Sequence, residues 1–240
     1  MTEPTDVQLL AGAIQTGDLD GIRRILDRRP ELANGPLGEH LKERTALHVV
    51  ADWPGFFPRG PEVVRLLVSH GADPNPPLTK PGDENPLHWA ASSDDVDVAR
   101  ALIDIGADIE APDGSIGTPL GNAIGYCCWH VAELLFQRGA RVDVLWHAAG
   151  LGLVDRINDL VESDPPSRQA LSEAFWHACS GARRRAAQRL LELGADPSWV
   201  LRPHSDETPL GAARGLGTAR SLLITWLEEI GAPPTPESGG

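Results

Sequence analysis

The chain has 240 residues, of which 41% are hydrophobic and 23% are charged, so it is long enough to bury a sizeable core and is expected to be soluble and globular. Its formal net charge of -13 disfavours nucleic acid as a partner, because proteins bind nucleic acid largely by neutralising its phosphates. No segment approaches the roughly 18 consecutive apolar residues of a membrane span, and the N-terminus lacks the basic and apolar regions of an export signal.

Cysteine usage indicates the compartment. Cys127, Cys128 and Cys179 form an odd set in a chain too long to need disulfide bonds for its stability. A reducing compartment is therefore expected, and the sequence predicts a cytoplasmic protein.

The predicted elements, taken in chain order, are pairs of short helices that repeat. The first pair lies in LLAGAIQTGDLDGIRRILDRRPELAN, where Leu10 and Ile25 are 15 residues apart. The same spacing separates Leu87 from Leu102 and Leu120 from Leu135. Four later segments share an opening motif, namely RTALHVVAD, NPLHWAASS, TPLGNAIGY and TPLGAARGL. A closing motif follows, as LLVSHGADPN, LIDIGADIEA, LFQRGARVDV and LLELGADPSW.

These motifs resemble the ankyrin repeat, which opens with TPLHxAA and closes with LLxxGAD. The resemblance implies an all-α solenoid of about seven helix-turn-helix units, with short β-hairpin-like connections, some of them shortened. The expected array covers residues 1–232, and its expected units are approximately 5–40, 41–81, 82–114, 115–140, 141–170, 171–204 and 205–232. Residues 233–240 are rich in Pro, Gly and Ser and are expected to form a disordered tail.

Several positions of the motifs are expected to be structural. The resemblance assigns His48 and His88, at the fourth place of the opening motif, to hydrogen bonds that tie adjacent loops together. The opening positions include Thr45, Thr118 and Thr208. A left-handed residue, best supplied by glycine, is expected just past the second helix of a pair. The glycines at this place are Gly71, Gly106, Gly139, Gly194 and Gly231.

Two departures from the repeat are expected to bear on function. The second unit carries about five extra residues in DWPGFFPRGP, which places Trp53, Phe56 and Phe57 in one loop. These aromatic side chains either cap the end of the apolar core or form an adhesive loop beside the groove. The connections GARVD and SDPPSRQALSE are short. Their shortness predicts that the inner helices of the fifth and sixth units are bare.

The segments VLWHAAGLG and AFWHACSGA belong to two degenerate units, in which Leu145 pairs with Leu160 and Phe175 with Leu190. In both segments a tryptophan holds the place of the structural histidine, and a histidine follows it at the place that faces the concave groove in ankyrin arrays. The expected groove stripe reads Val49, Trp89, Asn122, His147, His177 and Ala212, with Tyr126 near its lip.

Three hypotheses about this stripe remain open. The first is a non-catalytic scaffold that, as a monomer, binds another protein of neutral or basic surface through the groove and the finger loops. The second is a small-molecule-binding protein or enzyme with a pocket around His147 and His177, supported by Tyr126 or Asp52. The third is a surface without a ligand. The sequence favours the first, without membrane contact.

The sequence offers few signs of a metal site or of catalysis. Six cysteine and histidine side chains are candidate metal ligands by residue type, namely Cys127, Cys128, His130, His147, His177 and Cys179. They contain no CxxC or HxxxH pair, so we expect no metal and no cofactor. Nucleophile-elbow, phosphate-loop, dinucleotide-binding and HExxH motifs are also absent from the sequence. The sequence therefore predicts that the protein is not an enzyme.

Overall fold

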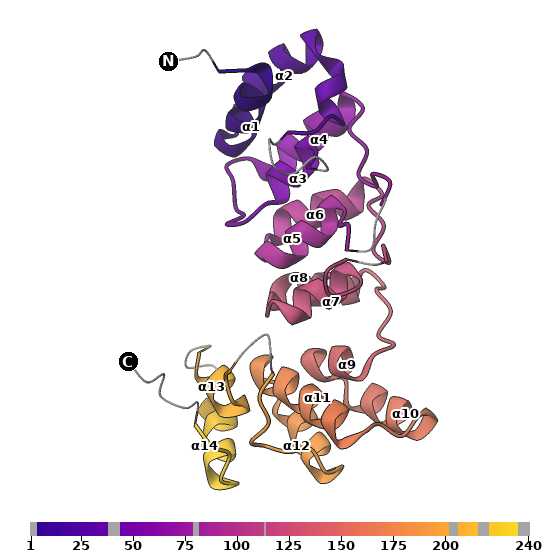
Figure 1. The fold of residues 1–240 in the computed structure, drawn as a ribbon, viewed down its shortest axis with the longest axis vertical. Helices are drawn as coiled ribbons and strands as arrows, with labels where there is room; N and C mark the ends of the chain where they lie inside the picture. The colour runs from indigo at the N-terminus through magenta and orange to yellow at the C-terminus, as the bar shows by residue number, and fades with distance from the viewer. Residues whose placement is uncertain are drawn as a thin grey trace. The chain divides into compact units, whose positions relative to one another are not determined.

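The computed structural model describes residues 4–37, 44–78, 82–112, 114–201, 206–215 and 221–234, and these ranges fold into α-helices joined by turns (Figure 1). Within them, the single isolated β-bridge joins Gly114 and Gly117, and no helix is both long and apolar enough to cross a bilayer. Most of the expected C-terminal tail, 235–240, lies outside the described residues. The chain divides into two compact units, Met1–Ala140 and Arg141–Gly240. Their boundary falls inside the short connection GARVD.

The described part of unit 1, Met1–Ala140, contains four helix pairs. The helices are α1 (Asp6–Thr16) with α2 (Leu19–Arg28), α3 (Ala46–Ala51) with α4 (Gly60–Ser69), α5 (Pro86–Ser93) with α6 (Val96–Asp104), and α7 (Pro119–Gly125) with α8 (Trp129–Gln137). A 3₁₀ turn over Pro30–Ala33 follows the first pair. The inner helices α1, α3, α5 and α7 contact one another in sequence, and so do the outer helices α2, α4, α6 and α8. Each pair therefore packs mainly on its neighbours, as expected of a repeat array.

In unit 2, Arg141–Gly240, the residues that the structure describes form three pairs. They are α9 (Leu145–Leu151) with α10 (Val154–Ser163), α11 (Arg168–Ser180) with α12 (Arg184–Glu192), and α13 (Pro209–Arg214) with α14 (Ser221–Glu229). Helix α11 contacts α9 on one side, α13 on the other and α12 within its own pair. It is the central inner helix of this unit.

The opening motif forms a helix because it supplies both a cap and a compatible first turn. Thr118 and Thr208 accept hydrogen bonds from the backbone N–H groups of Gly121 and Gly211 at 3.4 and 3.2 Å, and a proline occupies the first turn of each helix. A capping hydroxyl satisfies an amide that the helix cannot pair, and proline there removes a donor that needs no partner. Asn85 takes the same role for α5.

The core contains small side chains from the inner helix α5 and larger, branched side chains from the outer helix α4. Ala90 and Ala91 in α5 are fully buried, which lets neighbouring inner helices approach closely. In the outer helix α4, Val63, Val64 and Leu67 are fully buried at helical spacing, while the opposite face is open to water. The core of unit 1 therefore lies between its inner and outer rows of helices.

The closing motif ends in a turn that also links consecutive repeats. The GAD aspartates Asp73 and Asp108 accept backbone N–H bonds from residues two places later, at 2.8 and 2.9 Å. Asn75 donates to the Gly106 carbonyl at 2.9 Å and accepts from the Asp108 amide at 2.7 Å. Asn34 clamps the preceding repeat junction in the same way, bonding Gly71 and Asp73. The turns are thus joined by side-chain bridges.

The expectation about the fifth and sixth repeats is wrong. Helix α11 begins at Arg168, so the second half of SDPPSRQALSE is helical rather than a connection. Residues 174–180 of α11 are all buried, because this longer helix packs against α9, α12 and α13 at once. The inner helices in this region are therefore covered, although their connections are short.

Candidate functional site

The histidines at the fourth place of the opening motif join consecutive repeats. The Nδ1 atom of His48 accepts the Thr45 N–H at 3.1 Å, so the proton lies on Nε2, which donates to the Glu84 carbonyl at 2.9 Å. His88 is bonded in the same way: its Nδ1 accepts the Asn85 N–H at 3.2 Å, and its Nε2 donates to the Gly117 carbonyl at 3.0 Å. Burial lowers the pKa of His48 to about 4 and also lowers the pKa of His88. Both imidazoles are therefore neutral linkers near pH 7.

In the sixth repeat a tryptophan makes the same link. Trp176 Nε1 donates to the Glu207 carbonyl at 2.8 Å. Glu207 directly precedes the capping residue Thr208, just as Glu84 precedes Asn85. The indole N–H thus replaces the imidazole N–H at an equivalent place in the repeat.

His147 and His177 are not exposed in a groove, which corrects the expectation from the sequence. Their exposed fractions are 6% and 3%. The Trp146 ring centroid lies 4.1 Å from that of His147 and 4.8 Å from that of His177, so the indole covers both imidazoles. Burial, followed by the neighbouring His147, lowers the pKa of His177 to about 3. These two side chains do not form an accessible acid-base pair or a surface for contacts.

Asn122 is also buried rather than exposed in the groove, with an exposed fraction of 0%. Its Nδ2 donates to Glu84 Oε1 at 2.7 Å and to Ser92 Oγ at 3.3 Å, while its Oδ1 accepts the Ile116 N–H at 3.3 Å. The amide therefore organises neighbouring polar groups of the third and fourth repeats from beneath the surface.

The aromatic loop between α3 and α4 is held in place by the third repeat. Asp95 is buried and caps α6 through its Oδ1, which accepts the Val98 N–H at 3.1 Å. Its Oδ2 accepts the Phe56 N–H at 2.6 Å. Trp53 and Phe56 nevertheless remain 78% and 68% exposed, and Phe57 is half-buried. The loop backbone is thus fixed while two aromatic side chains project into water.

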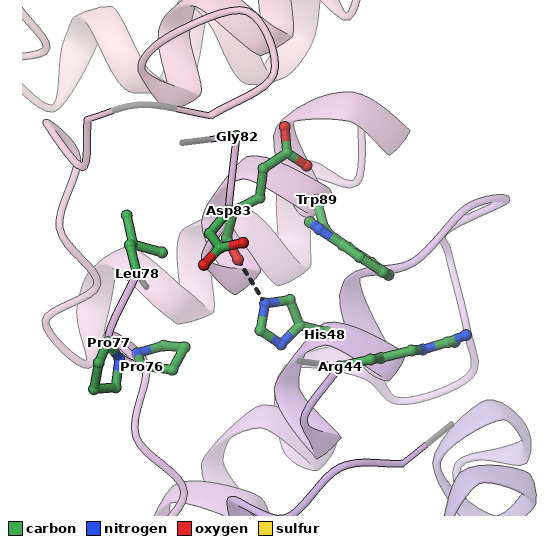
Figure 2. A pocket seen from close by; sticks show the side chains of 9 residues that line it. Arg44, His48, Pro76, Pro77, Leu78, Gly82, Asp83 and Trp89 are labelled. Atoms are coloured by element: carbon green, nitrogen blue, oxygen red, sulfur yellow. Dashed lines mark hydrogen bonds between the residues drawn. The ribbon is translucent and has the colours of Figure 1, made fainter. Parts of the chain in front are cut away.

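Trp89 separates two cavities on the surface of unit 1. The proline-side cavity, of about 210 Å³, is lined by Arg44, His48, Pro76, Pro77, Leu78, Gly82, Asp83, Glu84 and Trp89. The tyrosine-side cavity, of about 160 Å³, is lined by Asp52, Trp53, Glu84, Trp89, Ser92, Ser93 and Tyr126. Figure 2 shows the first of these, with Trp89 and Arg44 opposite Pro76, Pro77 and Leu78.

The indole of Trp89 is oriented by two neighbours. The His48 ring meets it edge-on with centroids 5.1 Å apart, and the Arg44 guanidinium carbon lies 5.7 Å from the Trp89 centroid, close enough for a cation–π contact (Figure 2). Arg44 also forms an ion pair with Asp52 at 2.6 Å. The ring is therefore fixed before any ligand arrives.

Glu84 is common to both cavities and is held as a carboxylate. Burial acts to raise its pKa, but hydrogen bonds from Ser115 and Asn122 outweigh that effect and lower the pKa below its ordinary value. Its Oε1 accepts the Ser115 N–H and Oγ–H at 3.0 and 2.6 Å, in addition to the Asn122 amide. A fixed negative charge thus stands beside Trp89.

Arg44 and Glu84 were not identified as site residues from the sequence. Both immediately precede the residue that opens an inner helix, Thr45 and Asn85 respectively. A charged side chain at that place is the signal that could have identified them, because it reaches the same surface as the inner helix. Among the described residues, no group of three or more His, Cys, Asp or Glu side chains could hold a metal ion.

Comparisons with known proteins agree with this geometry. The family model for ankyrin repeats (3 copies) matches residues 9–113 and 59–145. The Neurogenic locus Notch protein of Drosophila melanogaster is 30% identical over an alignment of 112 residues that covers 43% of this chain. The chain spans only 4% of the length of that relative. In the crystal structure of the ankyrin repeat domain of Bcl-3, a chain 24% identical to this one matches with a TM-score of 0.51, covering 94% of this chain and 100% of that chain.

Proposed function

The chain belongs to the ankyrin repeat family, and we propose from this premise that it is a non-catalytic scaffold that binds another protein through unit 1. Ankyrin repeats are generally protein–protein interaction modules that present a repeated surface to a partner. The binding surface proposed here, called the aromatic surface, consists of Trp53, Phe56, Trp89 and Tyr126.

Exposure of the aromatic side chains carries the proposal. Trp53, Phe56 and Tyr126 are 78%, 68% and 54% exposed. Trp53 and Tyr126 line the same cavity as Trp89. Large rings of this kind supply much of the binding energy in protein interfaces, because they lose apolar area to water when a partner covers them. Asp95 and Arg44 fix the loop and the indole beforehand, which reduces the ordering cost of association.

The charge of the chain supports the partner class expected from the sequence. A net charge of -13 repels acidic proteins and nucleic acid, so we propose a partner with a neutral or basic surface. We also propose a cytoplasmic location and a monomeric state. The buried thiols of Cys128 and Cys179 are compatible with a reducing compartment.

A paired capture experiment tests the proposal. The tagged parent chain and the double variant Trp53→Ala/Tyr126→Ala are used to capture proteins from the native host, and bound proteins are compared by quantitative mass spectrometry. A partner is then titrated against both chains by calorimetry. Because both side chains are mostly exposed, the double variant should keep its circular dichroism spectrum while its affinity falls about 100-fold.

The matched control is Phe136→Ala, which removes an exposed aromatic ring of α8 that lines neither cavity. This variant should bind the partner as tightly as the parent chain. Equal affinity of the parent and the double variant would exclude the aromatic surface as the binding site.

A further inference from the structure

We propose that the tyrosine-side cavity binds one basic side chain of the partner, the ammonium of a lysine or the guanidinium of an arginine. This inference rests on the proposed function, because it assigns the chemistry of one anchor point within the proposed interface. It concerns the cavity lined by Asp52, Trp53, Glu84, Trp89, Ser92, Ser93 and Tyr126.

The cavity has aromatic walls of the kind that attract a cation. Trp53, Trp89 and Tyr126 come from the loop after α3, from α5 and from the end of α7. Aromatic faces carry negative electrostatic potential, so a cation within about 6 Å of a ring centroid is attracted, most strongly by tryptophan. The volume of about 160 Å³ far exceeds the roughly 10–15 Å³ that a single water needs on the same measure. The end of a long side chain therefore fits.

The charge balance of the cavity also favours a cation. Its lining includes the carboxylates of Asp52 and Glu84 but no lysine or arginine. Asp52 is already paired with Arg44, at 2.6 Å, from outside the lining. The partners of Glu84 among the described residues are neutral donors, namely Ser115 and Asn122. The Glu84 charge is thus left for a cation to balance.

The carboxylate is arranged before binding occurs. The Glu84 hydrogen bonds from Ser115 and Asn122 all end on Oε1, and Asn122 itself is held by the Ile116 amide. These bonds keep the pKa of Glu84 below its ordinary value although burial acts to raise it, so the group is ionised throughout the physiological range. A fixed carboxylate discriminates a basic side chain from a neutral one of the same length, because only the basic one forms a charge-assisted hydrogen bond.

Short peptides test this inference without a known partner. The probes are acetyl-Gly-Lys-Gly-amide, its arginine counterpart, and a counterpart with norleucine, which has nearly the shape of lysine but no charge. Each is titrated into the full-length chain while the indole N–H resonances of its tryptophans are followed by nuclear magnetic resonance. The basic peptides should shift the Trp53 and Trp89 signals and bind about tenfold more tightly than the norleucine peptide.

Two variants separate this inference from the proposed function. Glu84→Gln keeps an oxygen that can accept from Ser115 and should lower the affinity for the basic peptides about tenfold. Glu62→Gln is the control, because it removes the same charge from an exposed residue of α4 that lines neither cavity. If norleucine binds as well as lysine, or if Glu84→Gln binds as the parent does, the inference is overturned. Loss of partner capture in Trp53→Ala/Tyr126→Ala would still support the aromatic surface.

Discussion

His177 couples the stability of unit 2 to pH. Burial lowers the pKa of its folded-state imidazole to about 3, whereas an unfolded histidine titrates near pH 6.5. The unfolded chain therefore binds a proton between these values that the folded chain does not. This contribution to stability is fully present above about pH 6.5 and is lost as the pH falls toward 3. Urea unfolding should show a loss of about 2 kcal/mol from this group between about pH 7 and about pH 5.

Two substitutions check the assignment to His177. His177→Leu should remove that part of the acid dependence, leaving a flatter profile. His130→Gln should not, because the pKa of the exposed His130 is raised by the hydrogen bond that its Nδ1–H donates to the Asp94 carboxylate, and its contribution to stability is lost as the pH rises. If His177→Leu lost as much stability between about pH 7 and about pH 5 as the parent chain does, another group would be responsible.

Trp176 is expected to contribute through its indole N–H as well as through its buried ring. In Trp176→Phe the Glu207 carbonyl loses a donor at 2.8 Å, which should lower the free energy of unfolding by about 1–2 kcal/mol beyond the lost ring area. Trp146→Phe is the comparison, because Trp146 makes ring contacts with both histidines but no hydrogen bond among the described residues. Equal losses in the two variants, measured by urea unfolding, would contradict a role for the hydrogen bond.

At single residues, the position in the repeat could be predicted from the sequence, but the burial of the side chain could not. The repeat register could be counted from leucine spacings, because a repeat must bury the same stripe each time. That register placed His147 and His177 correctly along the chain but gave them exposure that they lack. Their burial depends on the bulk of Trp146, which lies across both imidazoles. For His177 the covering ring comes from another helix, α9, so no pattern within α11 reports it.

At the level of elements, the glycine that follows five of the second helices, such as Gly106 after α6, is expected to stabilise the repeat by adopting a left-handed conformation. Gly106 has φ of 93°, and a Cβ atom built there would meet nothing within 4 Å. Gly106→Ala should therefore lower the free energy of unfolding by about 1–2 kcal/mol through backbone strain alone. Gly12, inside α1, offers the same open space in a helical conformation. Gly12→Ala should raise stability by about 0.5–1 kcal/mol.

Thermal and urea unfolding of the two alanine variants give the comparison. The free energy of unfolding should fall in Gly106→Ala and rise in Gly12→Ala, because the added methyl group is the same and only the backbone conformation differs. A Gly106→Ala variant as stable as the parent would mean that the left-handed turn is not strained by a side chain.

Element boundaries were harder to predict than element types. The helical pairs follow from capping residues and apolar spacing, and Thr118 and Thr208 do cap their helices. The start of α11 was missed because two prolines precede Ser167, which reads as a connection. Ser167 is the capping residue, accepting the Ala170 N–H at 3.2 Å, and the helix gains an extra turn after it. That turn places Ser172 Oγ where it accepts a hydrogen bond from the Asp196 N–H, at 2.9 Å.

At the level of the whole molecule, the excess of acidic side chains should make two properties respond oppositely to salt. These are the stability of the isolated chain and its rate of association with a basic partner. The chain carries 34 acidic and 21 basic residues. Ion pairs such as Arg23–Asp20 lie at the surface, with exposed side-chain fractions of 51% and 77%, and contribute little to stability. Repulsion among the excess carboxylates opposes compaction, whereas the same field attracts a basic partner.

Raising the ionic strength from about 0.01 M to about 0.15 M shortens the Debye length from about 30 Å to about 8 Å. We therefore expect the melting temperature of the isolated chain to rise by a few degrees, because internal repulsion is screened. Over the same range the association rate with a basic partner, measured by stopped-flow tryptophan fluorescence, should fall about tenfold or more. The dissociation rate should change much less, because contacts at the aromatic surface are short-ranged. An association rate that is insensitive to salt would contradict a basic partner and would favour the neutral surface that the aromatic side chains also accommodate.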